Sequence, residues 1–125
     1  MAKWKVLSYE TSDGVCEVED FLNARKSSDR AKGATWIATL QEEGPMLPRP
    51  YADLLENGIH ELRIKLSGDQ VRTLYFFTFG DVIVLTHSFI KHSSKVPEKE
   101  IRKAAKIRDD FLKRYPKREA LDAFF

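Results

Sequence analysis

Apolar residues follow two different periods in the first half of the chain, and each period predicts its own kind of element. Residues 4–9 are rich in β-prone side chains and run into a turn cluster at residues 12–14, so we expect a strand there. From about Val15 the apolar positions recur at helical spacing, and this pattern breaks at residues 27–29. Those three polar residues are N-cap candidates for a second helix, which we expect to end at Gly44.

The second half of the chain predicts three strands in quick succession, followed by one helix. Residues 59–66 alternate between apolar and charged side chains, which predicts a strand with one buried face. Residues 71–79 are almost entirely apolar, as in a central strand covered on both sides, and residues 82–89 predict the next strand. An apolar face at helical spacing then runs from Pro97 to Tyr115.

The predicted order of elements is β-αα-βββ-α, which is an α+β architecture. We expect an antiparallel sheet with the helices packed on one side of it. A single domain is expected over residues 1–116, with a short C-terminal tail over residues 117–125. The tail is apolar at its end, and the sequence leaves open whether it packs back on the domain or docks a partner.

Length and composition restrict the class of protein. The chain has 125 residues, of which 42% are hydrophobic, a fraction close to that of an ordinary globular domain. No apolar run approaches the ~18–20 residues that span a bilayer, and no secretory signal pattern is present, so we expect a cytoplasmic protein with no membrane partner. Cys16 is the single cysteine, so neither an internal disulfide nor a cysteine-based zinc site is expected.

Charge is distributed unevenly between the two halves. Residues 1–57 hold seven Lys and Arg against ten Asp and Glu, a net charge of −3. Residues 58–125 hold fourteen against nine, a net charge of +5. This asymmetry favours either a basic surface that meets an anionic partner or a solvated, lysine-rich helix without a partner.

Candidate chemistry centres on Arg72, which interrupts the apolar central strand. A charged side chain inside such a strand is costly unless it is paired or functional. Two interpretations stay open. Arg72 forms a salt bridge to Glu61 across the hairpin, or its guanidinium binds phosphate in a basic concavity.

Further candidates lie on the polar faces of the predicted strands or just beyond a strand end. They are Glu61, Arg63 and Lys65 on one strand, then His87, Phe89 and Lys91 on another, followed by His92 and Lys95. No spacing of histidine and acidic residues indicates a metal site, and neither a glycine-rich phosphate loop nor a nucleophile elbow is present. Arginine, lysine and histidine together suit the binding of a polyanion and proton transfer without a metal.

Three segments of the second half carry a resemblance to a known family. They are Gly-Ile-His-Glu-Leu-Arg at 58–63, Arg-Thr-Leu-Tyr-Phe at 72–76 and Phe-Ile-Lys-His-Ser-Ser-Lys-Val-Pro at 89–97. In this order and spacing they resemble the signature of HigB-type toxins, host-inhibition proteins of the RelE/ParE superfamily that are related to a phage-derived family. The family pattern is G-x-x-E-L-R, R-x-x-Y-F and F-x-K-K-[ST]-x-K-x-P, followed by a helix. The resemblance covers about residues 4–112 and implies a RelE/ParE-like fold.

This resemblance implies the toxin of a type II toxin–antitoxin pair, an endoribonuclease that cleaves messenger RNA without a metal or another cofactor. In such toxins the ribose 2′-hydroxyl attacks the adjacent phosphate, which leaves a 2′,3′-cyclic phosphate and a free 5′-hydroxyl. By analogy, Arg72 stabilises charge on the phosphate and His92 transfers a proton, with Arg63 and Lys91 completing the catalytic set. The expected RNA-binding residues are Lys65, Lys95, His87 and Phe89.

One position departs from the family pattern. The Lys-Lys pair of the family is Lys91-His92 here, so a fixed cation is replaced by a side chain that can titrate. The resemblance therefore leaves two outcomes open, an activity with stronger pH dependence or a weakened nuclease.

The resemblance also implies partners. They are a cognate helix-turn-helix antitoxin of the HigA type, messenger RNA and the 70S ribosome, with DNA contacted only through the antitoxin complex. Two alternatives share the same fold: a ParE-like toxin that binds DNA gyrase, and an idle homologue that binds an antitoxin without cleaving RNA.

Overall fold

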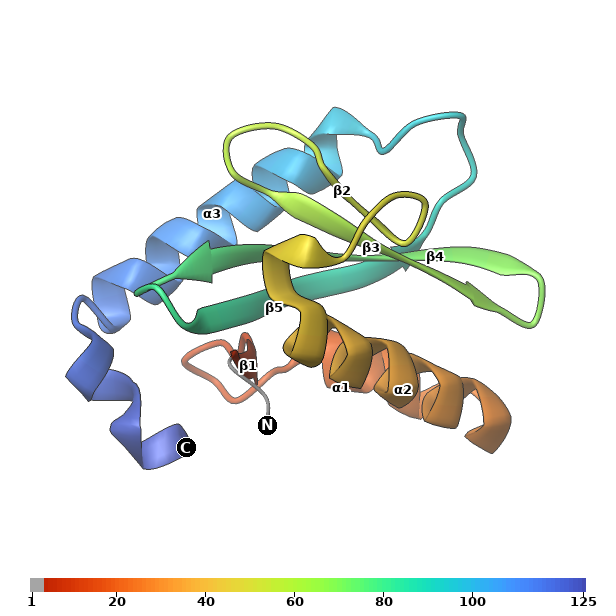
Figure 1. Cartoon of the computed structure of the whole chain (residues 1–125). Coiled ribbons are helices and arrows are strands. Elements are labelled where there is room, and N and C mark those ends of the chain that lie inside the picture. The colour runs from red at the N-terminus through yellow and green to blue at the C-terminus, as the bar shows by residue number, and fades with distance from the viewer. Residues whose placement is uncertain (1–3) are drawn as a thin grey trace.

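The computed structural model describes residues 4–125, so the first three residues of the domain expected over 1–116 lie outside the described part (Figure 1). The elements are β1 (Lys5–Ser8), α1 (Glu17–Asn23), α2 (Ser27–Glu43), η1 (Gly44–Met46), β2 (Ala52–Leu54), β3 (His60–Leu66), β4 (Asp69–Thr78), β5 (Val82–Ile90), α3 (Glu98–Arg114) and η2 (Arg118–Phe124). The α+β class and the order β-αα-βββ-α are thereby confirmed, and the architecture is that of a RelE/ParE-like fold. The short strand β2 and the two 3-10 helices, η1 and η2, were not predicted.

The sheet is mixed, whereas the sequence predicted an antiparallel one. Its five strands are ordered β1-β5-β4-β3-β2, and every neighbouring pair is antiparallel except the first. There, β1 pairs parallel to β5, with Lys5 opposite Val82 and Ser8 opposite Leu85. In the chain, β1 is followed by helices α1 and α2. In the sheet, β1 forms the edge beside β5, at the opposite edge from β2.

Helices cover both faces of the sheet, which corrects the expectation that all helices pack on one side (Figure 1). The residues of β4 and β5 are apolar on both faces, so both faces must be removed from water. Leu74 and Phe76 pack against Ile107 and Phe111 of α3. Apolar residues of the opposite face, such as Leu62 and Leu85, belong to a second core beneath α1 and α2.

A β-bulge in β5 changes which side chains face α3. Leu74 of β4 lies opposite His87, whereas its neighbour Tyr75 lies opposite Leu85, so Thr86 has no partner in the ladder. The extra residue reverses the alternation of β5. Val84 faces α3 before the bulge, and His87 faces α3 after it.

The apolar tail packs back on the domain, which answers the question that the sequence left open. Leu121 of η2 is fully buried in the core beneath α3. Arg118 holds the same segment to Asp81, the turn residue before β5, through two hydrogen bonds of 2.9 and 3.1 Å. Phe124 and Phe125 at the end of the chain stay about half exposed.

Asp29, expected as part of an N-cap, lies inside α2. There it is buried, pairs with Arg25 and accepts a hydrogen bond from Ser67.

Within residues 4–125 there is no helix that combines the length and the apolar character needed to cross a bilayer.

Candidate functional site

The face of the sheet that carries α3 also carries six of the eight side chains to which the resemblance gave a catalytic or RNA-binding role. The strand register arranges them in three rows across β3, β4 and β5. The rows are Glu61–Leu74–His87, Arg63–Arg72–Phe89 and, at the end of the sheet, Lys65–Gln70 with Lys91, whose backbone N–H donates to the Gln70 carbonyl. The predicted face with Glu61, Arg63 and Lys65 therefore also carries Arg72 of β4 and His87 and Phe89 of β5.

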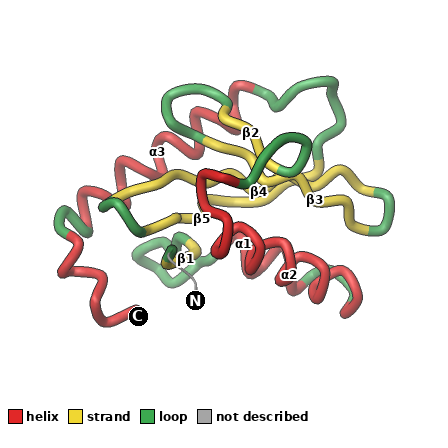
Figure 2. Tube along the Cα trace, in the orientation of Figure 1, coloured by secondary structure: helices red, strands yellow, loops and turns green. Residues whose placement is uncertain are grey.

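Helix α3 covers the first row. It leaves the other two rows uncovered, at the end of the sheet that lies toward the β3–β4 hairpin. Its first turn reaches the first row through Glu100, which contacts His87. The β3–β4 hairpin projects beyond α3, and the loop of residues 91–97 arches from β5 back to the start of that helix (Figure 2). We call this open part of the face, with Arg63, Lys65, Arg72, Phe89 and Lys91, the candidate site.

Arg72 forms the floor of the candidate site rather than its exposed centre. Its side chain is 8% exposed, and its Nε lies 2.8 Å from Oε1 of Glu61, whose side chain is 4% exposed. The N–H of Nε does not meet hydrogen-bond geometry, so charge holds this contact, while another guanidinium nitrogen donates to the Val71 carbonyl. Burial lowers the pKa of Arg72, an effect that Glu61 opposes and that Arg63 reinforces.

This geometry decides between the two interpretations of Arg72 in favour of the salt bridge. In the structure, the guanidinium is buried and its charge is paired, so it is not presented to a phosphate in solvent. The expectation that Arg72 is the exposed cation of a basic concavity is corrected. The physical reason is that Glu61 and Arg72 share one face of adjacent strands, where pairing removes the cost of burying either charge.

Arg63 lies above this pair and is about one-third exposed. Its Nε donates to the same Glu61 oxygen at 3.3 Å, and a terminal nitrogen donates to Asp53 of β2 at 3.4 Å. Asp53 also pairs with Arg49 at 2.9 Å, and that guanidinium is the main cause that lowers the pKa of Asp53. Three arginines and two carboxylates thus form one network with a net charge of +1.

The remaining predicted site residues are at the surface. Lys65 is exposed, Lys91 is partly exposed, and His92 and Lys95 are exposed in the loop that follows β5. No ion pair within 4 Å involves any of these four within residues 4–125. Arg63, Lys65 and Lys91 form the accessible cationic part of the candidate site, and the loop with His92 and Lys95 borders it.

His87 is buried, which corrects the expectation that its side chain binds RNA. Its ring is 1% exposed and stacks on Phe89, with ring centroids 5.6 Å apart. Nε2 lies 3.2 Å from Oε1 of Glu100, and Nδ1 lies 3.0 Å from the Thr86 hydroxyl. The Thr86 hydroxyl also donates to the Leu74 carbonyl at 3.1 Å. Burial lowers the pKa of His87, which favours a neutral ring.

The remaining histidine of the strands, His60, lies on the opposite face. It stacks on the buried ring of Tyr75 at 5.3 Å beside a cavity of about 220 Å³. Burial lowers the pKa of His60 and raises that of Tyr75. Neither residue belongs to the candidate site.

Sequence reasoning missed two of the three acids that organise this face, Asp53 and Glu100. The alternation of β3 placed Glu61 on one face with Arg63, and Glu61 was named as a partner for Arg72, but its contact with Arg63 was not predicted. Glu100 could not have been found this way, because its contact with His87 depends on where α3 packs and on the bulge at Thr86. In the part of the chain from residue 4 onward, no three His, Cys, Asp or Glu side chains gather in a group that could hold a metal ion.

Comparison with known proteins identifies the family. No curated protein sequence matches the chain. The model of one family, described as phage-derived protein Gp49-like (DUF891), matches residues 20–109, which include α2, the whole β3–β5 meander and most of α3. The matched residues include every residue of the candidate site and cover more than half of the chain, which therefore belongs to the phage-derived Gp49-like family.

Proposed function

We propose that this protein is the toxin of a type II toxin–antitoxin pair and that it binds and cleaves messenger RNA at the candidate site. The Gp49-like family is associated with toxin–antitoxin systems, which supports the first part of the proposal. The second part is carried by one observation. Arg63 and Lys65 of β3 and Lys91, which directly follows β5, lie on the same face of the sheet, with His92 and Lys95 next in the loop after Lys91.

The proposed reaction needs no group beyond these side chains and the RNA itself. The ribose 2′-oxygen forms a bond to the adjacent phosphorus, and the bond from phosphorus to the 5′-oxygen breaks. One proton leaves the 2′-hydroxyl and another reaches the 5′-oxygen, so the products are a 2′,3′-cyclic phosphate and a 5′-hydroxyl. Cations that stabilise the negative charge on the phosphate oxygens accelerate such a step.

The geometry changes the roles that the resemblance gave to these residues. Arg63 and Lys91, with Lys65 beside them, are the cations that can reach a phosphate. Arg72 is a positioning residue, since its pairing with Glu61 fixes the carboxylate that also holds Arg63. His92 is the proposed proton-transfer group, because it is exposed in the loop that borders the cationic row.

Two observations favour a second candidate function. Arg72, the residue assigned to charge stabilisation by the resemblance, is neutralised by Glu61. The catalytic Lys-Lys pair is also incomplete, because His92 replaces its second lysine. An idle homologue that keeps the fold and binds an antitoxin without cleaving RNA would show both features.

Expression in cells tests the proposal and separates the two candidates. We expect growth arrest with shortened messages, whose new 5′ ends appear by primer extension, and rescue by a co-expressed helix-turn-helix antitoxin encoded beside the toxin gene. The variant Lys65→Ala/Lys91→Ala, which removes two accessible cations, should grow normally. Arrest with intact messages and damaged DNA would indicate gyrase as the target, and no arrest would indicate the idle homologue.

A further inference from the structure

We propose that α3 carries a second RNA-binding surface, separate from the candidate site, which binds the phosphate backbone to one side of the cleaved linkage. The surface is the groove formed by Lys99, Arg102, Lys103, Lys106, Ile107 and Tyr9, with a volume of about 490 Å³. This proposal rests on the proposed function in one respect, because it assumes that RNA is the ligand of the candidate site.

The four cations of this groove form a stripe along one side of α3. Their spacing of three, four and seven residues places them on the same helical face. From Lys99 to Lys106 the helix rises about 10 Å, at ~1.5 Å per residue. Successive phosphates of one strand are ~3.4 Å apart along the axis of a duplex, which is less than the length of the stripe. The stripe can therefore contact more than one phosphate of the same strand.

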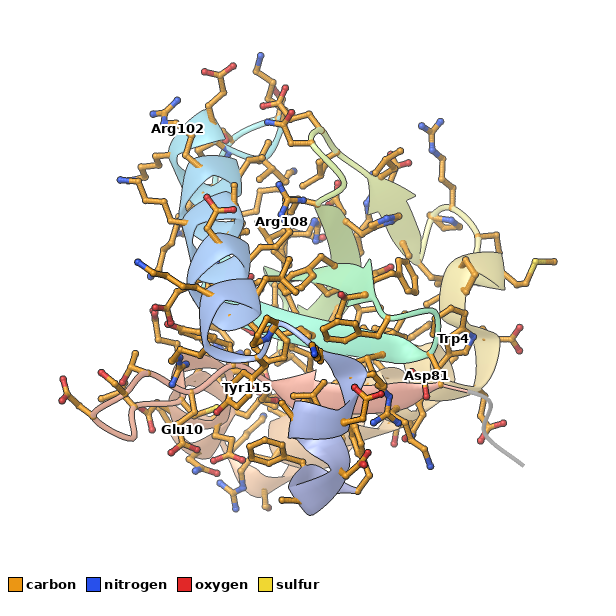
Figure 3. All side chains as sticks on the ribbon, turned by 90° about the vertical axis from the view of Figure 1, so that its left-hand side faces the viewer. Trp4, Glu10, Asp81, Arg102, Arg108 and Tyr115 are labelled. Atoms are coloured by element: carbon orange, nitrogen blue, oxygen red, sulfur yellow. The ribbon has the colours of Figure 1, made fainter. Side chains whose placement is uncertain are left out.

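The stripe projects away from the sheet and is only partly neutralised. Figure 3 shows Arg102 pointing outward at the beginning of α3, whereas Arg108 turns toward the loop at Asn57, whose carbonyl it contacts. Lys103 pairs with Glu17 at 2.6 Å, and Arg102 pairs with the exposed Glu98 at 3.4 Å. Within residues 4–125, neither Lys99 nor Lys106 has a carboxylate within 4 Å.

The groove offers little to an acidic protein segment. An amphipathic helix would need an apolar surface to bury, but Ile107 is 8% exposed and the Tyr9 hydroxyl already donates to Asp110 at 2.5 Å. Lysine ammonium groups are point charges that bind phosphate without demanding a fixed geometry. A flexible phosphate backbone is therefore the better match for this surface.

The stripe is also close to the candidate site. Lys103 is near enough to His87 to lower the pKa of that buried ring, and His87 stacks on Phe89 of the candidate site. Lys95, in the loop that joins β5 to α3, lies four residues before Lys99. A strand bound at Lys91 can thus extend past this loop onto α3.

Binding to a non-cleavable RNA tests the proposal independently of catalysis. The probe is a fluorescein-labelled, fully 2′-O-methylated single strand, which lacks the attacking hydroxyl, and its affinity is measured by anisotropy across a series of salt concentrations. The variant is Lys99→Ala/Lys106→Ala. The control is Lys32→Ala/Lys117→Ala, which makes the same change in net charge at exposed positions elsewhere.

The stripe variant should bind this probe about 10- to 30-fold more weakly than the parent, and its slope of log K against log salt should be smaller by about 1.4, as expected for two lost single-strand phosphate contacts. The control should bind like the parent. Equal binding by parent and stripe variant overturns the proposal. So does a stripe variant that loses affinity for its antitoxin while its RNA affinity is unchanged, since the surface would then bind a protein. If the stripe is required for binding while the parent cleaves no natural RNA, the second surface stands and the proposed nuclease activity fails.

Discussion

Arg72 and Glu61 form a buried ion pair on adjacent strands, with Nε and Oε1 2.8 Å apart and both side chains less than one-tenth exposed. The pair lies beneath Arg63, which contacts the same carboxylate. The family resemblance assigned charge stabilisation on the phosphate to Arg72, whereas in the structure Arg72 pairs with the carboxylate that also holds Arg63. The groups that can contact a phosphate are the more exposed cations around Arg72.

Replacing one member of this ion pair should destabilise the protein more than replacing both. Glu61→Gln leaves the Arg72 guanidinium buried without a countercharge, so we expect the free energy of unfolding to fall by roughly 3 kcal/mol. Glu61→Leu/Arg72→Met replaces both charges with apolar groups and should cost much less. Urea denaturation of the three proteins measures the difference. If the double variant were less stable than Glu61→Gln, the ion pair would stabilise the fold by more than the neutralisation of its two buried charges, which would contradict this prediction.

The C-terminal segment should behave as part of the folded domain. Leu121 is fully buried, so Leu121→Ala leaves a cavity and should lower the free energy of unfolding by about 3 kcal/mol. Phe124→Ala, at a side chain that is 52% exposed, is the matched control and should change stability far less. Chemical denaturation measures both variants. Equal effects of the two substitutions would argue that η2 does not pack as described.

Stability should depend on pH through His87. Burial lowers the pKa of this ring, and the nearby Lys103 lowers it further, while Glu100 and Glu17 oppose the shift. The unfolded chain therefore takes up the proton before the folded protein does, so stability is fully present above the ordinary histidine pKa of ~6.5 and is lost as pH falls below it.

Thermal melts between about pH 5.5 and about pH 7.5 measure this dependence. We expect a decrease in melting temperature toward acidic pH and a smaller decrease in His87→Gln. Part of the slope should remain in that variant, because burial also lowers the pKa of His60. Identical pH profiles for the parent and the variant would exclude His87 as a source of the effect.

The order of elements was predictable because it depends on local patterns. Helical and alternating periods are visible in the sequence, and the faces of β3 follow from its alternation, with Leu62 on one side and Arg63 on the other. The parallel pairing of β1 with β5 was not predictable, because it joins segments about 75 residues apart whose alignment is set by packing. The same holds for α3, whose position on the second face depends on long-range contacts.

The candidate site was predictable as a set of residues and not as a geometry. The shared face of Arg63, Lys65 and Arg72 follows from strand periodicity and the hairpin. Whether Arg72 is paired or free depends on the register between β3 and β4, so the sequence left both interpretations open. The burial of His87 depends on the bulge at Thr86 and on Glu100 of α3, which no local pattern indicates.

If His92 transfers a proton, its removal should slow cleavage without affecting the fold. His92→Gln keeps a polar side chain of similar size at an exposed position, and we expect cleavage on the ribosome to be roughly 10²-fold slower. Single-turnover cleavage rates measure the effect, and an unchanged melting temperature is the control. An unchanged rate would remove His92 from the mechanism.

The central claim is that the exposed cations around Arg63 cleave RNA by attack of the 2′-hydroxyl. The most direct measurement uses purified protein, 70S ribosomes programmed with a defined message, and analysis of the ends of the products. We expect a 2′,3′-cyclic phosphate and a 5′-hydroxyl for the parent and their loss in Arg63→Ala/Lys91→Ala, a variant whose fold is verified by its melting temperature. Intact message with the parent protein, or equal cleavage by the parent and the variant, would contradict it.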